Sequence, residues 1–406
     1  KAVFEKYHKL GFTAAHVMPE RGIFTGQSSF FCFSDPAKNK ALLIQDACLG
    51  IGFNPASFIV YPNSLMGVNA FLRQMLTDAA HFERSRSRWL KEMRGMARPE
   101  YSAHFENLAA YATGKKPVIF LCRNQHDIRR ALALAAEFNL NFMIADLGSE
   151  ASAVIPELKK AKARLLCTVA FKAPATSIYA QKGKDERERA EKEIYPQNPA
   201  KLASAGILFS FSSLGTDDPK AFTEGILKAI EAGLARETAL DALTKNPAAF
   251  FGLERVLGTI EPGKIANIVL AEGELLVKEP KVRSAFVDGK RFEIKEVKPG
   301  EGEKPTVNVS GKWELSVEGQ IGMKLTLELM QEEASLSGRL ITPFGAFDFT
   351  GGVVSGSDIS FEMTLSIAGQ EMDLFFSGSV TGDTMRGTVV QGTAGSAEFT
   401  AKRIPG

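Results

Sequence analysis

The sequence predicts a chain of two independently folded parts, an α/β part with a parallel sheet followed by an all-β part. Its 406 residues are two to three times the usual length of a domain. Residues 1–255 alternate short apolar runs with helical patterns, which is typical of parallel strands joined by crossover helices. Residues 306–406 carry a net charge of −6 and the preceding residues +8, so the two parts also differ in charge.

Composition excludes several classes of protein. The hydrophobic share of 45% and the charged share of 24% are average for soluble globular proteins, so neither a disordered nor a fibrous chain is indicated. A net charge of +2 does not by itself indicate a nucleic-acid partner. The four cysteines are scattered without a Cys-x-x-Cys pair, and no apolar run is long enough for a membrane-spanning helix. Because the chain starts at Lys1 within an amphipathic stretch, we expect further residues upstream.

Short β-rich runs give the predicted strands of the α/β part. They lie at 12–18, 118–122, 141–146, 164–170 and 207–213, with a weaker candidate at 58–61. Apolar residues at helical spacing predict helices at 66–93, 125–138, 153–161 and 219–234. Asn124 and Asp218 each stand just before a predicted helix, as expected of N-cap residues.

The rest of the chain is predicted to be β structure. Residues 256–294 show short strands and turns, and residues 295–309 have the Lys, Glu, Pro and Gly content of a linker. Residues 310–406 alternate apolar and polar side chains in eight runs joined by short Gly-rich turns. Eight such strands close most simply into an up-and-down barrel, which removes exposed edges.

The start of this barrel resembles the lipocalin-like barrels. Gly311-Lys-Trp313 opens it and Arg403 ends its last run. The resemblance implies that Trp313 and Arg403 form a barrel-closing pair. It leaves two interpretations open: a barrel packed solid, as a structural or docking module, and a barrel that binds a small apolar ligand.

Three groups of motifs in the first part resemble the amidohydrolases of the imidazolonepropionase/prolidase-like group. The most specific group is Asn246-Pro-Ala248, Phe251-Gly-Leu253, Leu257-Gly-Thr-Ile-Glu-Pro-Gly-Lys264 and Ala266-Asn-Ile-Val-Leu270. The others are Gly11-Phe-Thr-Ala-Ala15 with Gly22-Ile-Phe-Thr-Gly-Gln27, and Met66-Gly-Val68 with Pro117-Val118 and Asp127-Ile128. The resemblance implies a TIM-type (β/α)8 barrel over residues 1–255 that lacks its first strand in this chain, with 256–294 in a small β-sandwich.

The resemblance also implies a metal site, because these enzymes use His and Asp ligands to hold a divalent ion that activates water. In this sequence the corresponding positions hold Ile119, Leu121, Arg123, Leu147 and Leu214. None of these side chains is a metal ligand of the family. Asn267 also stands where the family has Asp.

We therefore expect an amidohydrolase-like domain that has lost its metal ligands, needs no cofactor, and is a non-catalytic scaffold or partner domain within a larger protein or assembly. The first alternative is a hydrolase of carbon–nitrogen bonds that binds zinc or another divalent metal through an upstream His-x-His. Asp146, His126 and Asp217 are weak candidates for a rebuilt site, and His16 lies within a predicted strand. Small-ligand binding by the C-terminal barrel is the second alternative.

Partners and location are expectations from the same reasoning. We expect another segment or chain to complete the barrel, and a homo- or hetero-oligomer, with no nucleic-acid partner and no membrane span. Basic residues around Trp89, between Arg84 and Arg98, could recruit an anionic partner, although a solvated helix face or a subunit contact explains them more simply. Large exported bacterial proteins of similar architecture suggest a periplasmic or extracellular location, by analogy only.

Overall fold

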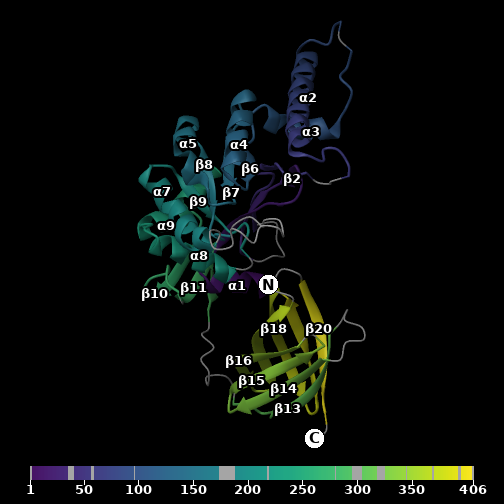
Figure 1. Ribbon diagram of the computed structural model, residues 1–406, viewed down its shortest axis with the longest axis vertical. Helices are drawn as coiled ribbons and strands as arrows, with labels where there is room; N and C mark the ends of the chain where they lie inside the picture. Colours follow the sequence, from purple (N-terminus) through teal and green to yellow (C-terminus); the bar gives the residue numbers. More distant parts are fainter. Residues whose placement is uncertain are drawn as a thin grey trace. The chain divides into compact units, whose positions relative to one another are not determined.

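A computed structural model describes residues 2–34, 41–55, 59–95, 97–172, 188–216, 219–278, 280–294, 304–317, 325–343, 345–367, 370–391 and 395–404. Contacts divide the chain into two compact units, residues 1–294 and 295–406 (Figure 1). Among the described residues, no helix is long and apolar enough to cross a membrane.

The first unit is built on a six-stranded sheet, in which all neighbouring strands are parallel except β2 and β5. In order across the sheet the strands are β2 (Phe24–Gln27), β5 (Leu49–Gly52), β6 (Val118–Cys122), β7 (Phe142–Asp146), β8 (Arg164–Thr168) and β9 (Phe209–Ser212). The predicted parallel strands are confirmed. Within the described residues the sheet is open, with β2 and β9 at its edges.

Helices connect these strands, as the sequence predicts. They are α2 (Leu65–Lys91) and α3 (Ala103–Ala112) before β6, α4 (Gln125–Glu137) before β7, η2 (Ala151–Val154) and α5 (Ile155–Ala161) before β8, and η3 (Ala190–Ile194), η4 (Tyr195–Gln197) and α7 (Asn198–Ser204) before β9. After β9 come α8 (Pro219–Glu231), α9 (Arg236–Leu243) and α10 (Lys245–Phe250). The N-cap prediction for Asn124 is confirmed, because its Oδ1 accepts hydrogen bonds from the backbone N–H groups of His126 and Asp127.

Two strand predictions differ from the structure. Residues 12–18 contain β1 (Ala14–Val17), which joins β3 (Ser29–Cys32) and β4 (Leu42–Ile44) in an antiparallel sheet. The dozen residues between β1 and β3 contain no helix, so they do not form the crossover that a parallel pair requires. The weaker candidate at 58–61 is wrong for its described residues: Ile59 to Tyr61 form bends, and the Ile59 side chain is 91% exposed. The first helix, α1, spans Ala2–Lys9.

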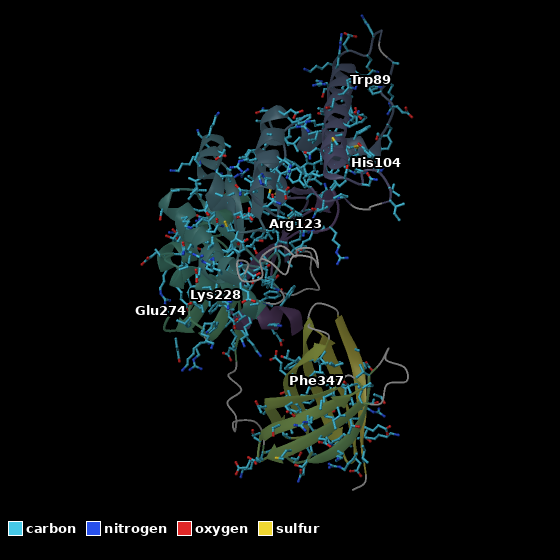
Figure 2. The ribbon with its side chains drawn as sticks, in the orientation of Figure 1. Trp89, His104, Arg123, Lys228, Glu274 and Phe347 are labelled. Atoms are coloured by element: carbon cyan, nitrogen blue, oxygen red, sulfur yellow. The ribbon has the colours of Figure 1, made fainter. Side chains whose placement is uncertain are left out.

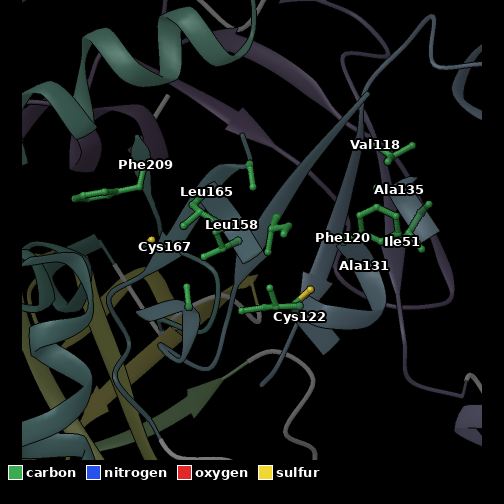
Figure 3. Close-up of a cluster of buried hydrophobic side chains, with 14 of the residues drawn as sticks. Ile51, Val118, Phe120, Cys122, Ala131, Ala135, Leu158, Leu165, Cys167 and Phe209 are labelled. Atoms are coloured by element: carbon green, nitrogen blue, oxygen red, sulfur yellow. The ribbon is translucent and has the colours of Figure 1, made fainter. Parts of the chain in front are cut away.

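Side chains of the parallel strands pack on two faces. One face, here the helix face, includes Phe120, Cys122, Ile144, Leu165 and Cys167 and packs against helices α4 and α5, as Figure 3 shows for part of the cluster. The other, here the inner face, consists of buried strand residues packed against Cys48 and against Phe250 of α10. The strand residues of the inner face are Ile119, Leu121, Met143, Ala145 and Leu166. The alternation follows from the two-residue period of a strand.

The long helix α2 begins at Ser64, whose Oγ accepts a hydrogen bond from the Gly67 backbone N–H. Its buried residues are spaced four, four and three positions apart and all lie in its first half: Val68, Leu72, Leu76 and Ala79. The second half has no buried residue. It extends away from the sheet with α3 beside it (Figure 1).

The end of the first unit is a small antiparallel sheet. Its strands are β10 (Ile268–Glu272), β11 (Lys281–Val287) and β12 (Lys290–Glu293). This agrees with the short strands and turns predicted for 256–294.

The second unit is a closed barrel of eight antiparallel strands in sequence order, which confirms the predicted fold. They are β13 (Gly311–Val317), β14 (Leu325–Glu332), β15 (Ser335–Thr342), β16 (Gly345–Ser355), β17 (Asp358–Ile367), β18 (Gln370–Thr381), β19 (Thr384–Gln391) and β20 (Gly395–Arg403). Trp313 pairs with Arg403 where β13 meets β20. The Arg403 guanidinium lies 4.3 Å from the Trp313 ring centroid and donates hydrogen bonds to the carbonyls of Asn308 and Ser310.

The last residues of the predicted linker pack onto this barrel. Val309 is fully buried, and its carbonyl accepts a hydrogen bond of 2.8 Å from the Trp313 indole N–H. The linker prediction therefore extends too far into the barrel, because an apolar residue before the first strand has a pocket to fill. Residues 295–303 lie outside the described residues.

Phenylalanine rings occupy the barrel interior. Phe349 stacks on Phe361, Phe361 on Phe376, and Phe376 meets Phe399 edge to face, with ring centroids 4.2, 4.8 and 5.4 Å apart. These contacts favour a packed interior over a ligand cavity.

A row of four charged residues crosses the outside of strands β13 to β16. Lys312 pairs with Glu328, Glu328 with Arg339, and Arg339 with Asp348, each directly opposite the next. Lys312 Nζ lies 2.8 Å from Glu328 Oε1, and Arg339 donates two hydrogen bonds to Asp348. Opposite charges facing each other across strands stabilise a sheet by a few tenths of a kcal/mol to about 1 kcal/mol per pair.

Candidate functional site

The carboxyl ends of β5 to β9 lie at the same edge of the sheet, because these five strands are parallel. Folds of this type place their functional groups at that edge. Arg123 directly follows β6, Leu147 directly follows β7, and Leu214 lies two residues after β9. The positions predicted to have lost metal ligands are therefore found at this edge and on the strands that lead to it.

Four of those five positions contribute to one apolar cluster. Ile119 and Leu121 are buried strand residues of the inner face, and Leu147 and Leu214 are partly buried against it. Leu121 stands beside Ala145 in the register, and Ala145 beside Leu166, so this row across three strands is apolar. Arg123 differs, because its side chain is exposed.

These residues do not fit a metal ion. A divalent ion needs several lone-pair donors to replace its water, and hydrocarbon side chains supply none. Among the described residues, no group of three or more His, Cys, Asp or Glu side chains is placed to hold a metal. The inner face therefore offers neither Lewis-acid chemistry nor a general base.

Asp146, the last residue of β7, lies on the helix face rather than the inner face. Its carboxylate is fully buried and accepts hydrogen bonds from the backbone N–H groups of Glu150 and Ala151, at 3.2 and 3.0 Å, and from Asn198 Nδ2 at 3.0 Å. Burial raises the pKa of the Asp146 carboxyl, against the hydrogen bonds, which lower it. The carboxylate thus ties η2 and α7 to the strand end, and it has no direct access to a ligand on the inner face.

The two other weak candidates differ in what can be said of them. His126 lies in the first turn of α4 with an exposed side chain, as the sequence predicts. It lines a surface cavity together with Arg123. Asp217, like the predicted N-cap Asp218, lies outside the described residues.

His16 is the imidazole beside the inner face. It lies on β1 and stacks on Phe251, which packs against the inner cluster, with ring centroids 4.2 Å apart. Burial lowers the pKa of His16 to about 4, so the ring is neutral at physiological pH. Its Nε2 is buried and has no hydrogen-bond partner among the described residues.

The four cysteines, all in the described residues, are buried and unpaired. Burial raises the pKa of the Cys48 thiol to about 12, and it raises the pKa values of Cys122 and Cys167 as well. A thiol that stays protonated is a poor nucleophile and a poor metal ligand. These cysteines therefore act as packing residues.

The basic run near Trp89 lies on the exposed second half of α2 and beyond it. Arg98 lies over the Trp89 ring at 5.6 Å, and Arg86 forms an ion pair with Glu106 of α3 at 2.9 Å. Figure 2 labels Trp89 and His104 on this hairpin. The contacts tie part of the run to the hairpin itself, which agrees with a solvated helix face.

Sequence reasoning missed the contacts that give two of these residues their surroundings. Asn198 reaches Asp146 from 52 positions away, and no local pattern predicts such a contact. Arg130 pairs with Asp127 at 2.7 Å and lies near Arg123 in the lining of one cavity. The spacing of three residues on a predicted helix could have placed Arg130 beside Asp127.

Comparison with known proteins identifies the first unit. Residues 184–298 match the model of the amidohydrolase family. An adenine deaminase of Archaeoglobus fulgidus is 34% identical over 106 residues, which are 26% of this chain and 18% of that protein. An adenine deaminase of Clostridium botulinum is 41% identical over 64 residues, 16% of this chain and 10% of that protein. The matched segment is thus less than a fifth of the length of either relative.

The fold has a counterpart among solved structures. An amidohydrolase from Thermotoga maritima superposes with a TM-score of 0.62 at 23% sequence identity, over 72% of this chain and 75% of that one. This agreement confirms the predicted α/β barrel class for the first unit, in a chain whose second unit is a separate eight-stranded barrel.

Proposed function

We propose that this chain, which carries an amidohydrolase-family domain, uses that domain as a non-catalytic scaffold or partner module within a larger protein or assembly. One observation carries the proposal: the predicted ligand positions Ile119, Leu121, Leu147 and Leu214 gather in a single apolar cluster. A working site would need polar groups at this place, because the hydroxide that attacks a carbon–nitrogen bond forms on a metal or beside a general base.

The surroundings of Asp146 support the same proposal. This carboxylate is the buried acid at a strand end, yet its oxygens are engaged by three donors on the helix face. A catalytic acid or base must be within hydrogen-bonding reach of the substrate. Asp146 is separated from the inner face by its own strand.

The open sheet supports a partner role. Within the described residues, β2 and β9 are edge strands, and edge strands pair readily with another chain or segment. Ile59 and Met66, at the start of the α2 region, are 91% and 81% exposed. We propose that another segment or chain completes the barrel, and that the assembly is exported; light scattering of the chain alone and with its neighbouring segment tests the first point.

Metal content and activity test the absence of catalysis. The chain is purified after growth with added zinc and manganese, and metal per chain is measured by mass spectrometry. The same samples are offered N-acyl amino acids, dipeptides and adenine. We expect far less than one metal per chain and no hydrolysis above a heat-denatured sample. One metal per chain, with turnover that a chelator removes, would contradict the proposal.

A metal-dependent hydrolase of carbon–nitrogen bonds, completed by an upstream segment, is the second candidate function. His16 favours it, because its buried Nε2 has no partner among the described residues and lies beside the inner face. The adenine deaminases among the relatives also point to hydrolysis. A chain extended upstream would then bind zinc stoichiometrically and hydrolyse its substrate, and His16→Phe would weaken zinc binding. If the extended chain binds no zinc, this candidate is wrong.

A further inference from the structure

A cavity of about 250 Å³ opens where β5 and β6 end. One part of its lining is apolar: Phe53 and Pro55 follow β5, and Leu65 begins α2. The other part carries charge, with the guanidinium groups of Arg123 and Arg130. Figure 2 labels Arg123 in the middle of the first unit. The cavity therefore combines a hydrocarbon wall with a cationic one.

The charge of Arg123 is uncompensated. Arg130 is neutralised by Asp127, whose Oδ1 accepts its hydrogen bond at 2.7 Å. The Arg123 side chain, in contrast, has no hydrogen bond or ion pair among the described residues, and it is exposed. With Asp127 already engaged by Arg130, the cavity keeps one positive charge that a ligand can neutralise.

The backbone of Arg123 is held firmly although its side chain is free. Its N–H donates to Asp127 Oδ2 at 3.1 Å. Its carbonyl oxygen is approached by Gly148 so closely that a Cβ on Gly148 would lie only 2.1 Å away, so only glycine fits there. The side chain thus projects from a fixed point, which reduces the entropy that binding must overcome.

The start of α4 does not supply the binding groups. The Asn124 side chain takes the N–H groups of His126 and Asp127, and Glu150 Oε2 takes that of Gln125 at 2.9 Å. Since these donors are already used, an anion in the cavity must be bound by side chains. Arg123 is the side chain with free donors and a full charge.

We propose that this cavity binds a small organic carboxylate, with Arg123 as its charge partner and the Phe53, Pro55 and Leu65 wall receiving its apolar part. A guanidinium matches a carboxylate or a phosphate with two parallel hydrogen bonds. The hydrocarbon wall selects between them, because inorganic phosphate has no apolar part to bury. The volume equals that of about eight water molecules, which suits a molecule of amino-acid size.

Binding is measured on the full chain by calorimetry, in EDTA so that a metal-bound anion plays no part. The probes are 4-methylvalerate and benzoate, with neutral 4-methylvaleramide and inorganic phosphate as comparisons. We expect both carboxylates to bind, the amide and phosphate to bind at least tenfold more weakly, and added salt to weaken carboxylate binding. The result is separate from the metal and activity measurements, so either proposal can fail alone.

Two variants and a matched control locate the site. Arg123→Gln should weaken carboxylate binding roughly tenfold to a hundredfold, as expected on losing a charged hydrogen-bond pair. Leu65→Glu should weaken it by placing a like charge on the wall. Arg129→Gln is the control, because Arg129 lies on the same helix but pairs with Glu157 and does not line the cavity.

The outcomes are decisive in each direction. Binding that Arg123→Gln and Leu65→Glu weaken, and that Arg129→Gln leaves unchanged, supports the proposal. Carboxylates that do not bind at 10 mM, phosphate that binds more tightly than both, or an Arg123→Gln variant that binds like the unchanged chain would overturn it. Thermal melting of each variant verifies that it is folded.

Discussion

Replacing Asp146 by asparagine should destabilise the first unit without touching a reaction. The carboxylate accepts three hydrogen bonds, from the Glu150 and Ala151 backbone N–H groups and from Asn198 Nδ2. The asparagine side chain keeps one oxygen and puts an NH2 group where the second acceptor was. At least one buried donor then loses its acceptor and meets another donor.

The magnitude follows from these contacts. Leaving a buried polar group without its partner costs about 1–3 kcal/mol, and one or two such groups arise here. Removing a buried charge, whose desolvation raises the pKa of Asp146, returns part of that cost. We therefore expect the free energy of unfolding to fall by about 2–4 kcal/mol. In a unit of this size that corresponds to a Tm lower by roughly 5–10 °C.

Urea unfolding followed by circular dichroism, with differential scanning calorimetry for Tm, measures the effect. Asp241→Asn is the matched control: its carboxylate is 41% exposed and pairs with Lys245, so its loss should cost less than about 0.5 kcal/mol. Adding Asn198→Ala should cost less in the Asp146→Asn background than alone, because the two side chains share one hydrogen bond. If Asp146→Asn unfolds at the same temperature as the unchanged chain, the assignment of this carboxylate as a structural tie is wrong.

Three further changes test other parts of the structure. Burial lowers the pKa of His16 from 6.5 to about 4, so the folded state holds that proton more weakly than the unfolded chain, and stability present above pH 6.5 is lost as the pH falls towards 4, by up to about 3 kcal/mol. His16→Phe should remove this loss, and equal acid dependence of the two chains in urea unfolding at pH 7, 5 and 4 would contradict it. Arg403→Gln should lower the melting temperature of the barrel through a loss of about 1–3 kcal/mol, since Trp313 loses its cation and two carbonyls lose their donor; Arg403→Lys should not restore it, and unchanged melting would count against the pair. Gly225→Ala should destabilise α8 in spite of alanine's higher helix propensity, because the added Cβ would lie 2.2 Å from the Val169 carbonyl oxygen; a higher Tm would show that the packing yields.

Local patterns predicted the elements whose causes are local. Asn124 was identified as an N-cap from its position before an apolar helical pattern, and its side chain does cap α4. The eight strands of the second unit follow from alternation, because a one-sided barrel strand must alternate. Such signals arise within a few residues, so a single sequence contains them in full.

The remaining features depend on contacts between distant residues. The antiparallel placement of β1 depends on its pairing with β3, where Ala14 faces Cys32, and the spacing of apolar residues in 12–18 does not specify a partner. The role of Asp146 depends on Asn198, and the cavity beside Arg123 depends on the chain after β5 meeting the start of α4. Sequence placed Arg123 at a strand end, but only the fold shows that its charge is uncompensated.

The charged row outside β13 to β16 has a consequence for how the barrel forms. Strands can pair in registers that differ by two residues and still bury the same faces. In any such shifted pairing of these strands, Lys312, Glu328 and Arg339 would meet uncharged neighbours. Those neighbours are Thr326 or Met330, Ser337 or Ile341, and Ala346 or Thr350, respectively. Three attractive pairs, together about 1–3 kcal/mol, are therefore present in one alignment and absent from its nearest competitors. The row acts as a proofreading device for hairpin assembly, and refolding in concentrated salt, which screens it, should yield more misaligned chains.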